Sequence, residues 1–231
     1  MRFKFLKGFT LAEVLITLGV IGVVAAMTIP TVMTAYQKHM VETRLKHVYS
    51  TILQSFKMIQ AQYGDVAFSV DDSWSYDNSK QVFEEFFAPV LVGVTAIPKS
   101  QRYYAYSPNG NKFSTDNQAV WYSLANGTVI GFAKPGAMDS VTFIVVLNPQ
   151  KQRTISGKDY FIFTFSADNN GEYRFQPMID TYYSKDREYE FAQYCKSETS
   201  YPAYSTSPPE FCTVLLVKNN FKIPASYPIK F

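Results

Sequence analysis

A predominantly apolar run of 21 residues, from Phe9 to Ile29, constrains this chain more than any other feature. As an α-helix the run would be about 31 Å long, which matches the hydrocarbon core of a bilayer. Three basic residues and no acidic residue precede it: Arg2, Lys4 and Lys7. Because positively charged flanks stay on the cytoplasmic side, the pattern predicts a single-pass inner-membrane protein whose N-terminus is cytoplasmic.

Three kinds of N-terminal segment share this pattern. A secretory signal peptide is cut after its apolar run, and Val24-Ala25-Ala26 resembles a small-residue cleavage site. A plain signal anchor is not cut at all. A prepilin leader is cut before the apolar run, so the run stays in the mature protein.

Glu13 is the charged residue within the run, and it favours the prepilin leader. A carboxylate inside a spanning helix costs about 2.5–3.5 kcal/mol on insertion scales, so it predicts a function. A cut between Gly8 and Phe9 would give Phe9 an ammonium group, four residues from Glu13 on the same helical face. Pairing within a subunit would neutralise both charges, and pairing between subunits would also favour docking in one register.

The residues Lys7-Gly8-Phe9-Thr10-Leu11-Ala12-Glu13 resemble the prepilin cleavage and methylation motif of type IV pilins and type II secretion pseudopilins. The resemblance implies that a prepilin peptidase cuts after Gly8 and N-methylates Phe9. Pro30 resembles the proline that kinks pilin helices just beyond the membrane core. The implied partners are the peptidase, other pilin or pseudopilin subunits, an inner-membrane platform protein and an assembly ATPase.

The function that this resemblance implies is a structural subunit of a type IV pilus or of a type II secretion pseudopilus. A minor pilin that acts as a binding module at a filament tip, in adhesion or DNA uptake, is the alternative. The chain then divides into a leader (residues 1–8), a membrane and filament-core helix (9–30), an amphipathic continuation (31–64) and a head outside the inner membrane (65–231).

Apolar residues at spacings of three and four predict that the helix continues past Pro30 to Tyr63, where Gly64 stops it. The stripe comprises Val41, Leu45, Val48, Ile52, Phe56, Ile59 and Tyr63. In the head, Ser79 is expected to cap a short helix that ends near Ala88.

Alternation and turn residues predict strands in the head. Asn126-Gly127 predicts a hairpin between residues 120–124 and 128–132, and residues 141–147 form an apolar run typical of a central strand. Alternating residues 160–166 and the return at 172–175 complete an antiparallel sheet of four or five strands. The predicted fold class is α+β, with a long helix packed on a small sheet, as in pilins.

Two cysteines, Cys195 and Cys212, predict one disulfide formed in an oxidising compartment. Closing that loop would stabilise the fold by about 3 kcal/mol in the chain-entropy model. The tyrosine-rich residues 182–209 are expected to form a surface loop that the disulfide fixes. Since aromatic loops also bind sugars, bases or neighbouring subunits, a binding role is the alternative.

Nothing in the sequence predicts catalysis, a metal or a cofactor. His39 and His47 are the histidines of the chain, and they complete neither a catalytic triad nor a zinc motif. Residues 168–172 resemble the start of a calcium loop but lack its bidentate acid. Without the three N-terminal cations, 19 basic residues balance 19 acidic residues, so bulk charge predicts no nucleic-acid partner.

Overall fold

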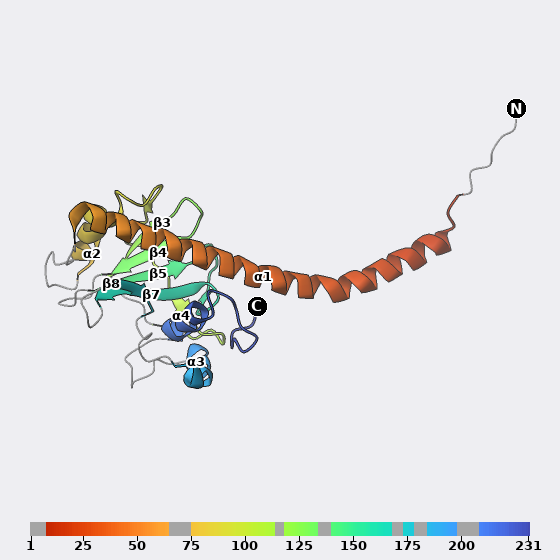
Figure 1. Ribbon diagram of the computed structural model, residues 1–231. Helices are drawn as coiled ribbons and strands as arrows, with labels where there is room; N and C mark the ends of the chain where they lie inside the picture. Colours follow the sequence, from red (N-terminus) through yellow and green to blue (C-terminus); the bar gives the residue numbers. More distant parts are fainter. Residues whose placement is uncertain are drawn as a thin grey trace, which may run out of the picture. The chain divides into compact units, whose positions relative to one another are not determined.

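The protein is described by a computed structural model, which places residues 8–64, 75–113, 118–133, 140–167, 173–177, 184–197 and 208–231. Over these ranges it is an α+β protein (Figure 1). It divides into two units: Met1–Met40 with Phe231, and Val41–Lys230. The N-terminal unit contains the first part of the long helix, and the second unit contains its remainder together with the sheet.

Helix α1 spans Leu11–Tyr63. It begins two residues later than predicted and ends as predicted, where Gly64 adopts a φ of 78° and donates its backbone N–H to Gln60 O at 2.9 Å. Glycine suits this left-handed position because it lacks a Cβ. The apolar stripe from Val41 to Ile59 is buried as predicted, whereas Tyr63 remains about half exposed.

The main sheet is antiparallel and has six strands in the order β1-β3-β4-β5-β7-β8. The strands are β1 Thr95–Ala96, β3 Val120–Ser123, β4 Val129–Ala133, β5 Ser140–Val146, β7 Tyr160–Ala167 and β8 Tyr173–Gln176. The predicted hairpin at Asn126-Gly127 and the central position of β5 are confirmed. The prediction of four or five strands missed β1, which is too short to leave a periodic pattern.

One face of the sheet packs against α1 through aromatic side chains. Phe163 and Phe165 lie two residues apart on β7 and therefore on the same face, and Phe175 of β8 is the register partner of Phe165. The ring centroids of Tyr49 and Phe163 are 5.6 Å apart, and the Tyr49 hydroxyl donates to the backbone oxygen of Phe175 at 3.0 Å. The C-terminal half of α1 is therefore an integral part of the head's core.

The same face also receives a short helical segment, α2 Tyr76–Val82 followed by the π-helix η1 Phe83–Phe87. The Phe83 ring stacks on the Tyr122 ring with 3.9 Å between the ring centroids, and the ring centroids of Phe87 and Phe143 are 5.2 Å apart. The prediction that Ser79 caps this helix was wrong. Ser75 is the N-cap, and its hydroxyl accepts the N–H of Asn78 at 3.1 Å, while Ser79 is buried inside the helix.

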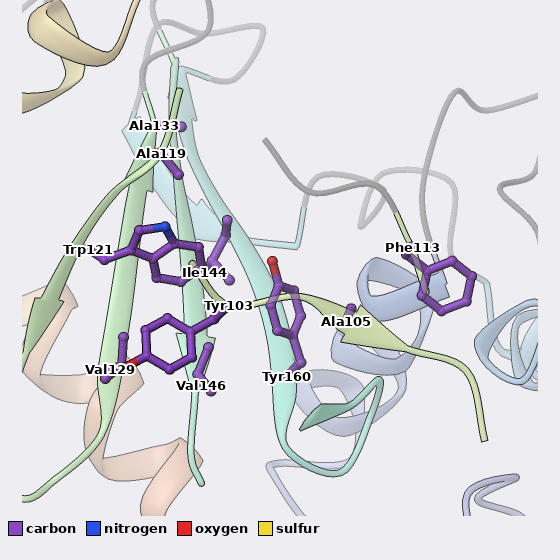
Figure 2. Close-up of a cluster of buried hydrophobic side chains, with 10 residues drawn as sticks. All are labelled: Tyr103, Ala105, Phe113, Ala119, Trp121, Val129, Ala133, Ile144, Val146 and Tyr160. Carbon is purple, nitrogen blue, oxygen red and sulfur yellow. The ribbon is translucent and has the colours of Figure 1, made fainter. Parts of the chain in front are cut away.

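The opposite face of the sheet carries a second buried cluster (Figure 2). Residues 103–113 cover this face and contribute three buried side chains, Tyr103, Ala105 and Phe113. They also contribute β2 Ala105–Tyr106, which pairs in parallel with β6 Thr154–Ile155. Gly131 lies opposite Trp121 in the register, and a Cβ on it would come within 2.7 Å of the indole ring.

We expect Gly131→Ala to lower the free energy of unfolding by about 1–3 kcal/mol, because the added methyl group overpacks the core. Urea unfolding followed by circular dichroism measures this change. In a Trp121→Leu background the same substitution should cost less, since the indole is gone. A stabilisation by Gly131→Ala, as strand propensity alone would give, would contradict the packing argument.

In its described parts, residues 184–197 and 208–231, the C-terminal region is largely helical, not the surface loop that the sequence predicted. It contains η3 Lys185–Arg187, α3 Glu188–Cys195 and α4 Pro208–Lys218. The predicted turn at 168–171 and most of the tyrosines in 182–209 lie outside the described residues, but Tyr189 and Tyr194 lie on α3. Both helices lack the regular apolar period of α1, which explains the wrong prediction.

Helix α4 covers a part of β7 that β8 does not pair with. The Thr213 hydroxyl accepts the N–H of Ile162 at 3.1 Å and donates to Pro209 O at 2.7 Å. Beyond α4, Asn220 and Phe221 adopt φ angles of 53° and 61°, and Phe221 N–H bonds Leu216 O at 2.7 Å. This helix end turns the chain back towards α1.

The returning C-terminal segment is fixed to α1 by aromatic and polar contacts. The ring centroids of Phe221 and Tyr49 are 4.9 Å apart. The Glu42 carboxylate accepts the backbone N–H of Ile223 at 2.8 Å and binds Lys222 Nζ at 2.9 Å. The last residues of the head thus lie against the same helix that begins the chain's folded part.

Candidate functional site

The first part of α1 exposes large apolar side chains. No residue in the most apolar stretch of this helix is buried, and the helix is long and apolar enough to cross a membrane. The exposed large apolar side chains between Phe9 and Ile29 are Phe9, Leu11, Val14, Leu15, Ile16, Leu18, Val20, Ile21, Val23, Val24, Met27 and Ile29. A soluble protein rarely exposes so much contiguous apolar surface, so this segment is built to be covered by lipid or protein.

Thr10 and Glu13 form a capping box at the start of α1. Glu13 Oε2 accepts the backbone N–H of Thr10 at 2.8 Å and the Thr10 hydroxyl at 2.8 Å. In return, the Thr10 Oγ1 accepts the backbone N–H of Glu13 at 3.3 Å. This capping box was not predicted from the sequence, although Thr10-Leu11-Ala12-Glu13 carries its Thr-x-x-Glu signature.

The capping box gives Glu13 a local role besides the predicted assembly role. The carboxylate satisfies a backbone donor that the helix leaves unpaired, and a negative charge is favourable in the first turn. The same bonds direct the carboxylate towards the N-terminal end of the helix. Any test of Glu13 must therefore separate its charge from its hydrogen bonds.

Gly8 and Phe9, the predicted cleavage site, lie just before the helix. Phe9 is 90% exposed, and no other part of the described chain comes within 4 Å of a Cβ built on Gly8. Pro30, the predicted kink, lies inside α1, which continues through it without a break. The kink therefore stays a prediction, as do the cut and the N-methylation of Phe9.

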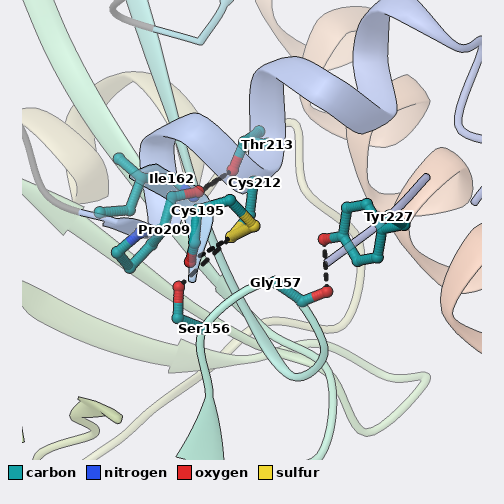
Figure 3. Close-up of a disulfide and its surroundings, with 8 residues drawn as sticks. All are labelled: Ser156, Gly157, Ile162, Cys195, Pro209, Cys212, Thr213 and Tyr227. Carbon is teal, nitrogen blue, oxygen red and sulfur yellow. Dashed lines mark hydrogen bonds between the residues drawn. A yellow bond between two sulfur atoms is a disulfide. The ribbon is translucent and has the colours of Figure 1, made fainter. Parts of the chain in front are cut away.

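Cys195 and Cys212 form a disulfide, which joins the end of α3 to α4 (Figure 3). Both residues are buried. The Ser156 hydroxyl lies 3.6 Å from Cys212 Sγ, and the Tyr227 hydroxyl donates to Gly157 O at 2.6 Å. Burial raises the pKa of Tyr227, so its hydroxyl stays protonated as this donor.

Gly157 is required for this close packing. Its φ is 75°, and a Cβ there would lie 2.6 Å from Cys212 Sγ and 2.7 Å from the Tyr227 hydroxyl. The turn before β7, the disulfide and the C-terminal segment therefore meet at a position that only glycine can occupy without displacement.

A buried carboxylate, Asp159, organises the connection between β5 and β7. It accepts from Lys151 Nζ at 2.7 Å, from Asn148 Nδ2 at 2.6 Å and from the backbone N–H of Ile155 at 3.2 Å. Asn148 in turn accepts from Arg44 of α1 at 3.3 Å. These partners compensate the charge of Asp159, and no short-range sequence pattern pointed to the network.

No catalytic or metal-binding arrangement is visible in the ranges that the structure describes. There, no group of three His, Cys, Asp or Glu side chains is close enough to hold a metal ion. His39 and His47 are both exposed on α1 and lie eight residues apart along the helix.

Comparisons with known proteins give one family. No curated protein and no solved structure matches the chain. The model of a family of unknown function, DUF6613, matches residues 31–231, which include the second half of α1 and the whole head. The protein therefore belongs to the DUF6613 family.

Proposed function

We propose that this protein is a prepilin-type subunit that is inserted in the inner membrane and is then assembled into a pilus or a secretion pseudopilus. A prepilin peptidase cuts between Gly8 and Phe9 and methylates the new amine. Residues 9–30 anchor the subunit and later form the filament core, while the head lies outside the inner membrane. A peptidase, sister subunits, a platform protein and an assembly ATPase act on it.

The observation that carries this proposal is the position of Glu13, an acid in the first turn of an otherwise apolar and exposed helix. Its carboxylate lies 2.8 Å from the backbone nitrogen of Thr10. Only the two backbone carbons of Phe9 separate that nitrogen from the nitrogen of Phe9. A cut after Gly8 would therefore place a new ammonium group beside this carboxylate.

The charge pair gives the apolar segment an energetic reason to assemble. In lipid, both charges are costly, and helices gain little from apolar contact alone. A neighbouring subunit can offer its own Glu13 to the ammonium of Phe9 only when the two helices dock in one register. The apolar surface of residues 9–30 then packs against neighbouring helices, and the charge pair between Glu13 and Phe9 fixes how far the helices are shifted along one another.

The mass of the N-terminal peptide tests this proposal. The full chain is extracted from membranes of cells with and without a prepilin peptidase, digested and examined by mass spectrometry. We expect a peptide that starts at N-methylated Phe9 in the first strain and an uncut N-terminus in the second. Gly8→Val should give the uncut form in both strains, while Gly19→Val, within the apolar segment, should be processed normally.

Two outcomes would contradict the proposal. A peptide that starts at Met27 in both strains would identify a secreted protein cut after Ala26. An N-terminus that keeps residues 1–8 in both strains would identify a plain membrane anchor, and Glu13 would then serve the helix cap alone.

A further inference from the structure

A hollow of about 300 Å³ lies between α3, α4 and the C-terminal segment, within the second unit. One face of α3, with Glu188, Tyr189, Ala192 and Gln193, forms a wall, and Lys196, which follows the last residue of the helix, extends it. Leu215 of α4 completes the lining together with Pro224, Ser226, Tyr227 and Pro228 of the C-terminal segment. A volume of this size suits a small molecule rather than a protein element.

The apolar part of the lining is aromatic and rigid. Tyr189 lines the hollow and is 76% exposed although it is a large side chain. Pro224 and Pro228 have little conformational freedom to lose on binding, and Ala192 and Leu215 are fixed by helices. The exposed ring is thus available to stack on a ligand without displacing another side chain.

The polar part of the lining combines donors and acceptors and is electrically balanced. Glu188 and Lys196 carry opposite charges. The Ser226 hydroxyl donates to Glu188 Oε1 at 3.3 Å, which orients the carboxylate. Among the described residues, the side chains of Gln193 and Lys196 have no hydrogen-bond or ion-pair partner, so both are available to a ligand.

We propose that this hollow binds a small uncharged saccharide, in the size range of a mono- or disaccharide. A sugar ring presents an apolar C–H face, which fits Tyr189, and hydroxyl groups at its edge, which need both donors and acceptors. Gln193, Glu188 and Lys196 supply them together. The inference goes beyond the proposed filament role and does not depend on it.

Charge and polarity disfavour other small ligands. An anion would meet the Glu188 carboxylate, and a cation would meet the Lys196 ammonium group. A purely apolar ligand would cover these polar groups without replacing their hydrogen bonds to water, which is costly. An uncharged ligand with many hydroxyl groups avoids all three penalties.

Calorimetric titration of the full chain tests the inference, in a detergent whose head group carries no sugar. The probes are the methyl glycosides of glucose, galactose, mannose and N-acetylglucosamine, and the disaccharide lactose. We expect saturable binding of at least one probe. Tyr189→Ala should weaken it about tenfold or more, which corresponds to 1.4 kcal/mol, while Tyr189→Phe keeps the ring and should retain most of the affinity.

Matched variants make the result specific to the hollow. Gln193→Ala should also weaken binding, whereas Tyr36→Ala and Gln62→Ala change exposed side chains on α1, outside the hollow, and should leave it unchanged. All variants are checked by circular dichroism for an unaltered fold. Absence of binding with every probe overturns the proposal, and so does binding that survives both Tyr189→Ala and Gln193→Ala. The proposal is also overturned if a zwitterionic dipeptide binds and none of the saccharides does.

Discussion

Replacement of Glu13 by Gln is expected to reduce incorporation of this subunit into filaments at least tenfold, while the head stays folded and the leader is still removed. The glutamine oxygen can still accept the N–H of Thr10, so the helix cap survives. What disappears is the charge, which leaves the ammonium of a neighbouring Phe9 unpaired in an apolar bundle. Breaking a buried ion pair on one side costs about 3–5 kcal/mol, well over the 1.4 kcal/mol of a tenfold effect.

Sheared filaments and membranes, separated by centrifugation and probed with an antibody to the head, measure this incorporation. Thr10→Ala is the matched control, because it removes the cap's hydroxyl at a cost of about 1 kcal/mol but keeps the Glu13 charge. A mild defect in Thr10→Ala and a severe one in Glu13→Gln assigns the role to charge. If Glu13→Gln assembles normally and Glu13→Ala does not, the capping box is what matters, and the charge-pair mechanism is wrong.

Removal of the disulfide by the double substitution Cys195→Ala/Cys212→Ala is expected to lower the free energy of unfolding by about 3 kcal/mol. The bridge joins residues 17 apart in sequence, and without it the unfolded chain gains the freedom of that loop. Small cavities at two buried positions add to the loss. Urea unfolding of the full chain in detergent, followed by circular dichroism, measures the change.

Two controls separate the covalent bond from its surroundings. The unaltered protein in excess dithiothreitol should reproduce the loss, apart from the cavity contribution. Ser156→Ala removes the hydroxyl that lies 3.6 Å from Cys212 Sγ and should cost much less than the double variant. A change below about 1 kcal/mol in the double variant would show that packing of α3 and α4 alone holds this region.

The parts of the fold that follow a regular period could be predicted from the sequence. The stripe along α1 repeats over five turns, and the strands β3, β4, β5 and β7 show alternation, a turn signal or a continuous apolar run. Such patterns directly reflect which side chains are buried. The end of α1 was also predictable, since Gly64 marks it.

The parts that depend on tertiary contacts could not be predicted in this way. Helix α4 is buried almost all round, so its residues show no polar face, and α3 is only two turns long. The partners of Asp159 come from separate segments, and the hollow beside Tyr189 needs the chain's last residues to close it. In the first part of α1, the apolar run and Glu13 could be recognised in the sequence. The hydrogen bond between the Glu13 carboxylate and Thr10 was not predicted.

The attachment of the C-terminal segment to α1 has a consequence for the order in which this protein can fold. Glu42 and Ile223 are hydrogen-bonded although 181 residues separate them in the chain. Helix α4, which covers the start of β7, is also synthesised after every strand of the sheet. Until the ribosome has made residues 208–231, α1 and the sheet lack the helix and the C-terminal segment that pack on them, so the native structure of the head cannot be completed before these residues emerge. Until then the nascent head carries incompletely covered apolar surface, and an interrupted or truncated chain is the form most exposed to aggregation and degradation.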